Sequence, residues 1–214
     1  MQLKNFSIFI QGVVKEGKHL QRVNINGKKV KQTWLFSTRF LSVLFAILLI
    51  FLTPSGFTND FAGYTISFLA IFVGLFSSIV IALHDKNSNL SDGYSDLDST
   101  QRARIKQKKN YLIQFTGLTS YAILLAIVII ILLLFVLFRD FDEINIRNYV
   151  WCKSIKEISS RNVTLFFKLL LSVLYRFCVY NLLINFFAIT LYATTSYFSF
   201  VLAGYRKPLK IDQE

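Results

Sequence analysis

Residues 121–138 read YAILLAIVIIILLLFVLF and contain no charged side chain. Apolar and polar residues do not alternate along this stretch, as they would in a strand of a membrane β-barrel. As a helix rising 1.5 Å per residue, the stretch is about 27 Å long, close to the bilayer's hydrocarbon core of about 30 Å. Because unpaired backbone groups are costly in lipid, the stretch is predicted to be a transmembrane helix.

Outward from this stretch, the chain contains further apolar blocks of similar length. The four predicted spans are residues 34–53, 61–83, 111–138 and 180–203. Hydrophobic residues make up 54% of the 214 residues and charged residues only 17%, against roughly 25% charged in soluble domains. This composition excludes a disordered chain and a disulfide-rich scaffold. The predicted fold class is all-α, a polytopic membrane protein whose transmembrane domain covers residues 34–203.

The chain ends are predicted to be short polar segments. Residues 1–33 form a basic N-terminal segment without the apolar region of a cleavable signal peptide, and residues 204–214 form a tail. The N-terminal segment allows two interpretations, an interfacial amphipathic helix or a charged leader that only sets topology. The helix would place four apolar residues near one face: Leu3, Phe6, Ile10 and Val14. Asn26 and Gly27 add a hairpin signal within residues 20–33.

The last apolar block is longer than a bilayer requires. Residues 162–203 contain neither Gly nor Pro and would reach about 63 Å as one helix. Lys168 and Arg176 mark the half expected to lie outside the hydrocarbon. Two alternatives stay open for residues 164–179: a separate interfacial helix, or an extension of the fourth span.

Basic residues are distributed unevenly across the predicted loops. With the N-terminus inside, 17 Lys and Arg lie on the cytoplasmic side and 7 on the other. The positive-inside rule therefore predicts that both termini lie in the cytoplasm. No direct nucleic-acid contact is expected, because no aromatic side chains alternate with the basic ones. The predicted contacts with lipid or a partner protein are Arg102, Arg104, Lys106, Lys108, Lys109, Lys28, Lys29 and Lys31.

Two patterns of small or polar residues predict helix contacts. A ridge at spacings of three and four runs through Gly63, Ser67, Ala70, Gly74 and Ser78. A 3.5-residue repeat runs through Cys178, Asn181, Asn185, Ala188, Tyr192, Thr195 and Ser199. The ridge predicts close packing within the chain or between subunits. The repeat predicts a packing seam or the lining of a pore, and together the patterns predict a homo-oligomer.

Candidate catalytic chemistry is missing from the sequence. The two histidines and two cysteines match no zinc site, nucleophile–base pair or catalytic triad. No catalytic, cofactor-binding or metal-binding residue is therefore predicted, and the chain is not expected to be an enzyme. The polar loop at residues 85–98 is instead expected to bind a protein partner.

The layout resembles the membrane component of the two-gene Kiwa anti-phage system. The matching features are the length, the four spans, the basic N-terminus and the polar loop at residues 84–110. Small four-span accessory proteins of RNA-targeting CRISPR systems look similar at this level. The Kiwa resemblance implies an inner-membrane sensor that oligomerises, as a tetramer, and holds a cytoplasmic DNA-binding effector. The competing interpretation is a pore-forming effector that depolarises the membrane when triggered.

Overall fold

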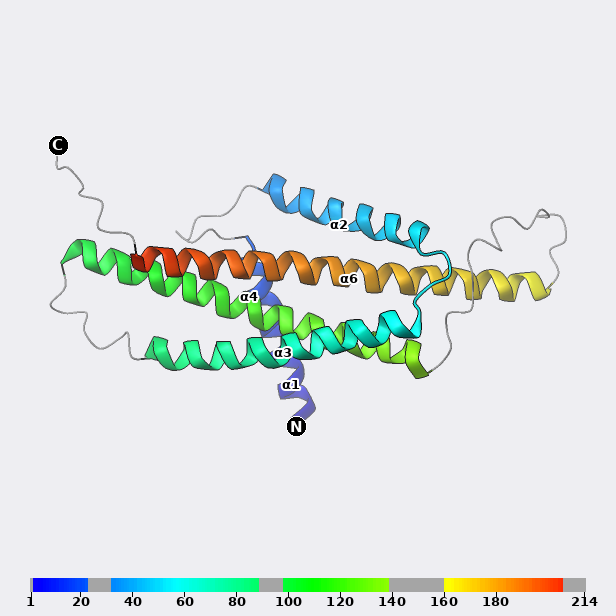
Figure 1. Cartoon of the computed structure of the whole chain (residues 1–214), viewed down its shortest axis with the longest axis horizontal. Coiled ribbons are helices and arrows are strands. Elements are labelled where there is room, and N and C mark those ends of the chain that lie inside the picture. Colours follow the sequence, from blue (N-terminus) through cyan, green and yellow to red (C-terminus); the bar gives the residue numbers. More distant parts are fainter. Residues whose placement is uncertain (1, 23–31, 89–97, 139–159, 206–214) are drawn as a thin grey trace. The chain divides into compact units, whose positions relative to one another are not determined.

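The computed structural model describes residues 2–22, 32–88, 98–138 and 160–205. This described part contains helices and no strand (Figure 1). The helices are α1 (Gln2–Leu20), α2 (Gln32–Leu52), α3 (Asn59–Ser88), α4 (Ser99–Phe138) and α6 (Ser160–Tyr205). The all-α prediction is thus confirmed for these residues. The predicted contacts Lys28, Lys29 and Lys31 lie outside the described residues, as does most of the loop at residues 85–98.

Three helices are long and apolar enough to cross a membrane. The apolar segments are Asn59–Leu83 in α3, Ile105–Phe138 in α4 and Phe166–Ser199 in α6. In α2 the described apolar segment, Phe40–Leu52, is shorter. Three of the four predicted spans therefore correspond to apolar helices of sufficient length.

The alternative left open for residues 164–179 is decided by α6. This helix continues without a break through 46 residues, so residues 164–179 belong to the same helix as residues 180–203 and are not a separate helix. No Gly or Pro interrupts residues 162–203, and these are the residues that commonly end or kink a helix. The apolar segment begins at Phe166, well before the predicted start at residue 180.

The helices contribute to two compact units. The first unit consists of Met1–Gln32, Leu75–Ile123 and Ala188–Glu214, and therefore holds α1, the end of α3, the beginning of α4 and the end of α6. Its buried apolar side chains include Leu112, Phe115, Leu118 and Ala122 from α4. The rings of Phe115 and Tyr197 lie 5.3 Å apart between centroids and join α4 to α6.

Within the first unit, α1 runs across α4 instead of beside it along its length (Figure 1). A Cβ atom placed on Gly17 would lie 2.6 Å from Cβ of Tyr121. A Cβ atom on Gly117 would lie 2.3 Å from Leu20 Cδ1. The backbones approach closely because neither glycine has a side chain. The predicted N-terminal helix is confirmed over Gln2–Leu20, and Ile10 and Val14 of its apolar face are half-buried.

The second unit comprises Thr33–Gly74 and Leu124–Phe187. Leu69, Ile129, Leu133, Val179 and Phe186 are fully buried here. Phe72 meets Phe186 edge-on, with ring centroids 4.7 Å apart, and so joins α3 to α6.

Packing of α2 within this unit is looser. An apolar hollow of about 280 Å³ separates it from α6; the hollow is lined by Ile47, Ile50, Phe51, Leu170, Val173, Leu174 and Phe177.

Candidate functional site

A fully buried arginine lies in the second unit. The side chain of Arg176 is 0% exposed, and its Nη1 donates to the carbonyl oxygen of Pro54 across 3.1 Å. Pro54 belongs to the turn after α2, where helix-terminal carbonyls lack partners within the helix. A buried charge requires such hydrogen bonds, because transfer from water into an apolar interior is costly. Arg176 therefore fastens the α2–α3 turn to α6.

Two tyrosines on α6 make further polar contacts in this region. Tyr180 Oη and Thr53 Oγ1 lie 2.7 Å apart, and the hydroxyl of Tyr175 donates to the Leu132 carbonyl of α4. Phe57 packs between these tyrosines, with ring centroids 6.3 Å from Tyr175 and 5.0 Å from Tyr180. The turn and two helices thus share one polar and aromatic cluster.

The turn also requires a glycine. Gly56 has φ of 91°, a left-handed conformation that side chains other than that of glycine rarely adopt. Phe57, which follows it, is buried. Gly56 therefore turns the chain so that Phe57 enters the cluster.

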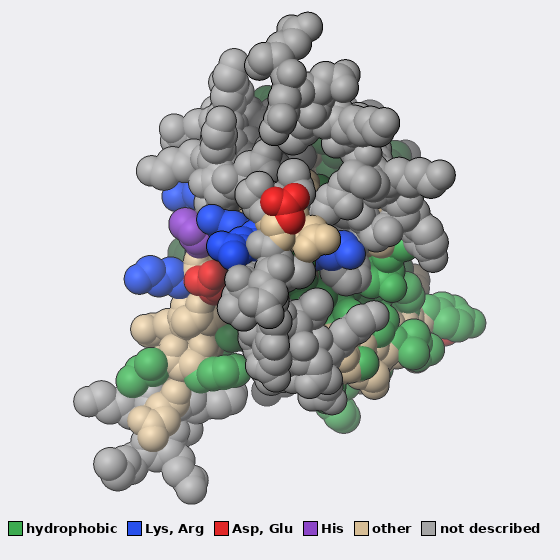
Figure 2. All heavy atoms as spheres, turned by 90° about the vertical axis from the view of Figure 1, so that its left-hand side faces the viewer, with side chains coloured by type: hydrophobic (Ala, Val, Ile, Leu, Met, Phe, Trp, Pro, Cys, Tyr) green, Lys and Arg blue, Asp and Glu red, His purple; other side chains and the backbone are tan. Residues whose placement is uncertain are grey.

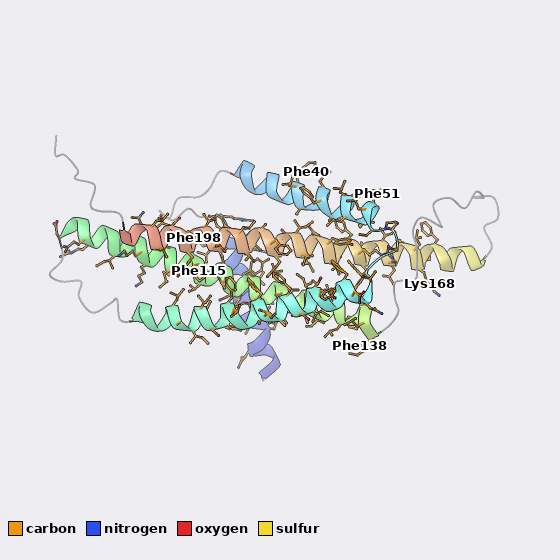
Figure 3. The ribbon with its side chains drawn as sticks, viewed as in Figure 1. Phe40, Phe51, Phe115, Phe138, Lys168 and Phe198 are labelled. Carbon is orange, nitrogen blue, oxygen red and sulfur yellow. The ribbon has the colours of Figure 1, made fainter. Side chains whose placement is uncertain are left out.

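The two cations that the sequence places outside the hydrocarbon have different surroundings. The side chain of Arg176 is completely buried in protein. Lys168 is exposed and points away from α6 (Figure 3). One signal in the sequence distinguishes them, because tyrosines that can form hydrogen bonds lie only one residue before and four residues after Arg176.

In the first unit, Gln114 connects three helices. Its Nε2 donates to the Tyr192 hydroxyl of α6 across 3.1 Å and to the Leu20 carbonyl of α1 across 3.4 Å. Gln114 is only 4% exposed. Leu20 is the last residue of α1, and carbonyls in the last turn of a helix lack a hydrogen-bond partner within that helix. The bond from Gln114 therefore holds the C-terminal end of α1 in place. Sequence reasoning did not single out Gln114, although it is a polar residue inside an apolar block.

The predicted polar repeat on α6 divides between the two units. Asn185 Nδ2 donates to the Asn181 backbone carbonyl and to Asn181 Oδ1, at 2.8 and 3.1 Å. Tyr192 contacts Gln114, as described above. Cys178, Ala188 and Thr195 are exposed, and Ser199 is half-buried. In the described part of the chain, the repeat is therefore only partly used for packing between helices.

The predicted small-residue ridge faces outward on α3. Gly63 is half-buried, and the exposed members are Ser67, Ala70, Gly74 and Ser78. A Cβ atom added to Gly63 or Gly74 would have none of the described neighbouring atoms within 4 Å. The close helix approaches within the chain occur instead at Gly17 and Gly117, which sequence reasoning missed. Among the described residues, Gly63 and Gly74 are thus not sites of close packing within this protomer.

Basic residues of α4 form a line on one helix face. Arg102, Lys106 and Lys109 are spaced by four and three residues and are exposed. Lys108 projects from another face and is half-buried, while the side chain of Arg104 lies outside the described residues. Figure 2 looks onto the end at which α4 begins and shows Lys and Arg side chains beside a histidine. Three of the predicted contacts on α4 therefore form one exposed stripe.

Apolar side chains cover most of the remaining described surface. Phe40, Phe51, Phe138 and Phe198, shown in Figure 3, are 61%, 78%, 81% and 61% exposed. Exposure of many large apolar side chains suits lipid contact.

Among the described residues, no three His, Cys, Asp or Glu side chains are grouped as metal ligands. No protein-family model, curated protein or solved structure matches the chain.

Proposed function

We propose that the chain is a non-enzymatic sensor or scaffold of the bacterial inner membrane, with four spans and both termini in the cytoplasm. It assembles into a homo-oligomer and recruits a soluble, DNA-binding effector for anti-phage defence. The resemblance of the layout to the Kiwa membrane component supports the defence role. The length and apolar character of the helices support the membrane location.

The observation that carries this proposal is the outward ridge on α3. Small residues in a membrane helix let a second helix approach closely, and packing is the main force for association in lipid. Gly74 is exposed, with room for a side chain beside it. A surface shaped for close packing, but not used for it within the protomer, is suited to contact another copy. An oligomer also brings several cytoplasmic loops together, and multiple sites raise avidity for a partner.

The decisive experiment identifies the partner. The tagged full-length protein is purified in mild detergent from its native host at native expression, and the co-purifying proteins are identified by mass spectrometry. Replacing residues 86–97 by a Gly/Ser linker of equal length is expected to leave insertion and assembly intact and to release the effector. Retention of the effector by this variant, with unchanged affinity and salt dependence, would place the docking site elsewhere.

A pore is the second candidate function. It is favoured by the two amide side chains of Asn181 and Asn185, which lie half-buried in an apolar helix and pair along that helix. If several copies placed these amides around one axis, ions could cross. Phage infection should then depolarise cells that contain the protein, and Asn181→Leu with Asn185→Leu should abolish the depolarisation. Unchanged membrane potential during a defence response excludes this function.

A further inference from the structure

We propose that α1 and the beginning of α4 together form a binding surface for the phosphate headgroups of anionic phospholipids. This inference rests on the part of the proposed function in which α4 crosses the membrane with its N-terminal end in the cytoplasm. It does not depend on recruitment of a partner.

The first observation is a second cationic stripe, on α1. Lys15, Lys18 and Arg22 are spaced by three and four residues, and all three are exposed. The turn after α1 continues the helical path, because the Gln21 amide donates to the Gly17 carbonyl and the Arg22 amide to the His19 carbonyl. Glu16 is the one acidic residue of α1. The exposed surface at this end of α1 is therefore strongly basic.

The second observation is that the two helices that carry these stripes are in contact. Leu20 contacts α4 at Gly117, and Gln114 donates to the Leu20 carbonyl. Gly117 is eight residues from Lys109, or about 12 Å along the helix. Gly117 and Tyr121, which α1 contacts, are one helical turn apart and therefore lie on the same face of α4. This face lies beside the stripe of Arg102, Lys106 and Lys109. Two helices in contact thus present six exposed cations.

The third observation is the depth at which this surface lies. Gly17 packs against Tyr121, the first residue of the charge-free stretch 121–138. That stretch is about 27 Å long and matches the hydrocarbon core, so α1 crosses α4 where the chain leaves the hydrocarbon. Figure 1 shows that α1 runs across α4. With α4 crossing the membrane, as proposed, α1 would lie along the membrane plane. Cations at the membrane surface meet lipid headgroups. A nucleic acid would have to pass between the headgroups to reach these cations.

Charge complementarity therefore selects the occupant. Anionic lipids attract basic segments next to the membrane, with an effect of about fivefold in affinity for each Lys or Arg near the surface. Ile8 and Phe9, which are 58% and 68% exposed on α1, add apolar surface that suits the boundary between headgroups and acyl chains. The surface thus combines phosphate-binding and lipid-binding chemistry.

The test measures lipid binding directly. Full-length protein in detergent micelles is titrated with phosphatidylglycerol or with phosphatidylcholine, and bound lipid is quantified by native mass spectrometry. We expect tighter binding of phosphatidylglycerol. Lys106→Gln with Lys109→Gln, and separately Lys15→Gln with Lys18→Gln, should each weaken that binding by about fivefold per cation removed. The control is Lys168→Gln, which removes one exposed cation of α6, outside this surface, and should leave the preference unchanged.

A second pair of variants tests the geometry without removing charge. Gly17→Leu forces α1 away from Tyr121 and should reduce the preference for phosphatidylglycerol, although every cation is retained. Gly12→Leu lies on the same helix, where no described neighbouring atom is within 4 Å, and should keep the preference. If Gly17→Leu does not fold, the charge variants still decide the question.

Three results would overturn the proposal. The first is an equal loss of phosphatidylglycerol binding, per cation removed, in the Lys168→Gln control. The second is no loss in either cation pair of the proposed surface. The third is displacement of the lipid by inorganic phosphate or by a short DNA duplex at the same concentration, which would assign the surface to those ligands. Because the assay contains no partner protein, its failure leaves effector recruitment untouched.

Discussion

Arg176 Nη1 donates to the Pro54 carbonyl oxygen across 3.1 Å, so that a charge on α6 joins the turn between α2 and α3. The guanidinium is fully buried inside an apolar segment. Ionisable residues in such segments are usually paired or functional, because an unpaired charge in lipid is expensive. Here the partner is a backbone carbonyl, which gives the arginine a role in holding helices together.

Removing this arginine should therefore destabilise the protein. Arg176→Ala is expected to lower the free energy of unfolding by about 2 kcal/mol, because it removes a charged hydrogen bond and leaves the Pro54 carbonyl without its donor. Arg176→Lys should recover part of the loss, since an ammonium can donate but lacks the planar fork. Unfolding in detergent, followed by circular dichroism against temperature, measures both. Lys168→Ala, an exposed change on the same helix, should be nearly neutral; equal unfolding of the two alanine variants would contradict the assigned role.

The bond between Thr53 and Tyr180 should appear as an energetic coupling. Thr53→Val and Tyr180→Phe each remove one hydroxyl of a pair that lies 2.7 Å apart. A double-mutant cycle should give a coupling of about 0.6 kcal/mol, the average for hydrogen bonds between membrane helices. Thr116→Val is the matched control, because the Thr116 hydroxyl donates to the Leu112 carbonyl of its own helix. The effects of Thr116→Val and Tyr180→Phe on the free energy of unfolding should simply add. If the effects of Thr53→Val and Tyr180→Phe also simply add, the result argues against the bond between Thr53 and Tyr180.

Glycine substitutions should separate contacts between subunits from contacts within one. Gly74→Leu is expected to weaken the oligomer while leaving the protomer's stability unchanged, because no described neighbouring atom lies within 4 Å of a Cβ there. Gly117→Leu should instead destabilise the protomer, since its Cβ would lie 2.3 Å from Leu20 Cδ1. Native mass spectrometry reports the oligomer, and thermal unfolding reports stability. A monomeric unmodified protein would refute assembly altogether.

The two asparagines of α6 give an independent test of assembly. Asn181→Leu with Asn185→Leu removes polar groups that pair along their own helix and are still half-buried. If these amides also pair across subunits, the double variant should dissociate at lower detergent concentration than the unmodified protein. Thr194→Val is a suitable control, because the Thr194 hydroxyl donates to the Thr190 carbonyl within α6. The same oligomer stability in both variants would remove the asparagines from the interface.

Topology is the remaining prediction. Reporter fusions after residues 57, 95, 150 and 214 should report outside, inside, outside and inside, because 17 of the 24 Lys and Arg then face the cytoplasm. Alkaline phosphatase is active outside, and green fluorescent protein folds inside, so the two reporters control for each other. An outside signal at residue 95 or 214 contradicts the predicted orientation.

The helical fold was predictable because lipid restricts the backbone so severely. An apolar stretch such as residues 121–138 has to satisfy its backbone hydrogen bonds internally, and a helix does so for any apolar sequence. The absence of Gly and Pro from residues 162–203 allowed a long helix, but did not predict whether it would break at the membrane surface. That the helix continues from Ser160 to Tyr205 became clear only in the structure.

Side-chain contacts were not predictable in the same way, because they depend on residues far apart in the chain. The sequence by itself determined the apolar helices and the concentration of basic residues around α4. Only the tertiary structure decided that Arg176 is buried against Pro54, that α1 packs at Gly17 and Gly117, and that the ridge at Gly74 faces outward. Lipid is as apolar as leucine, so an apolar pattern identifies a membrane helix without showing which face contacts protein.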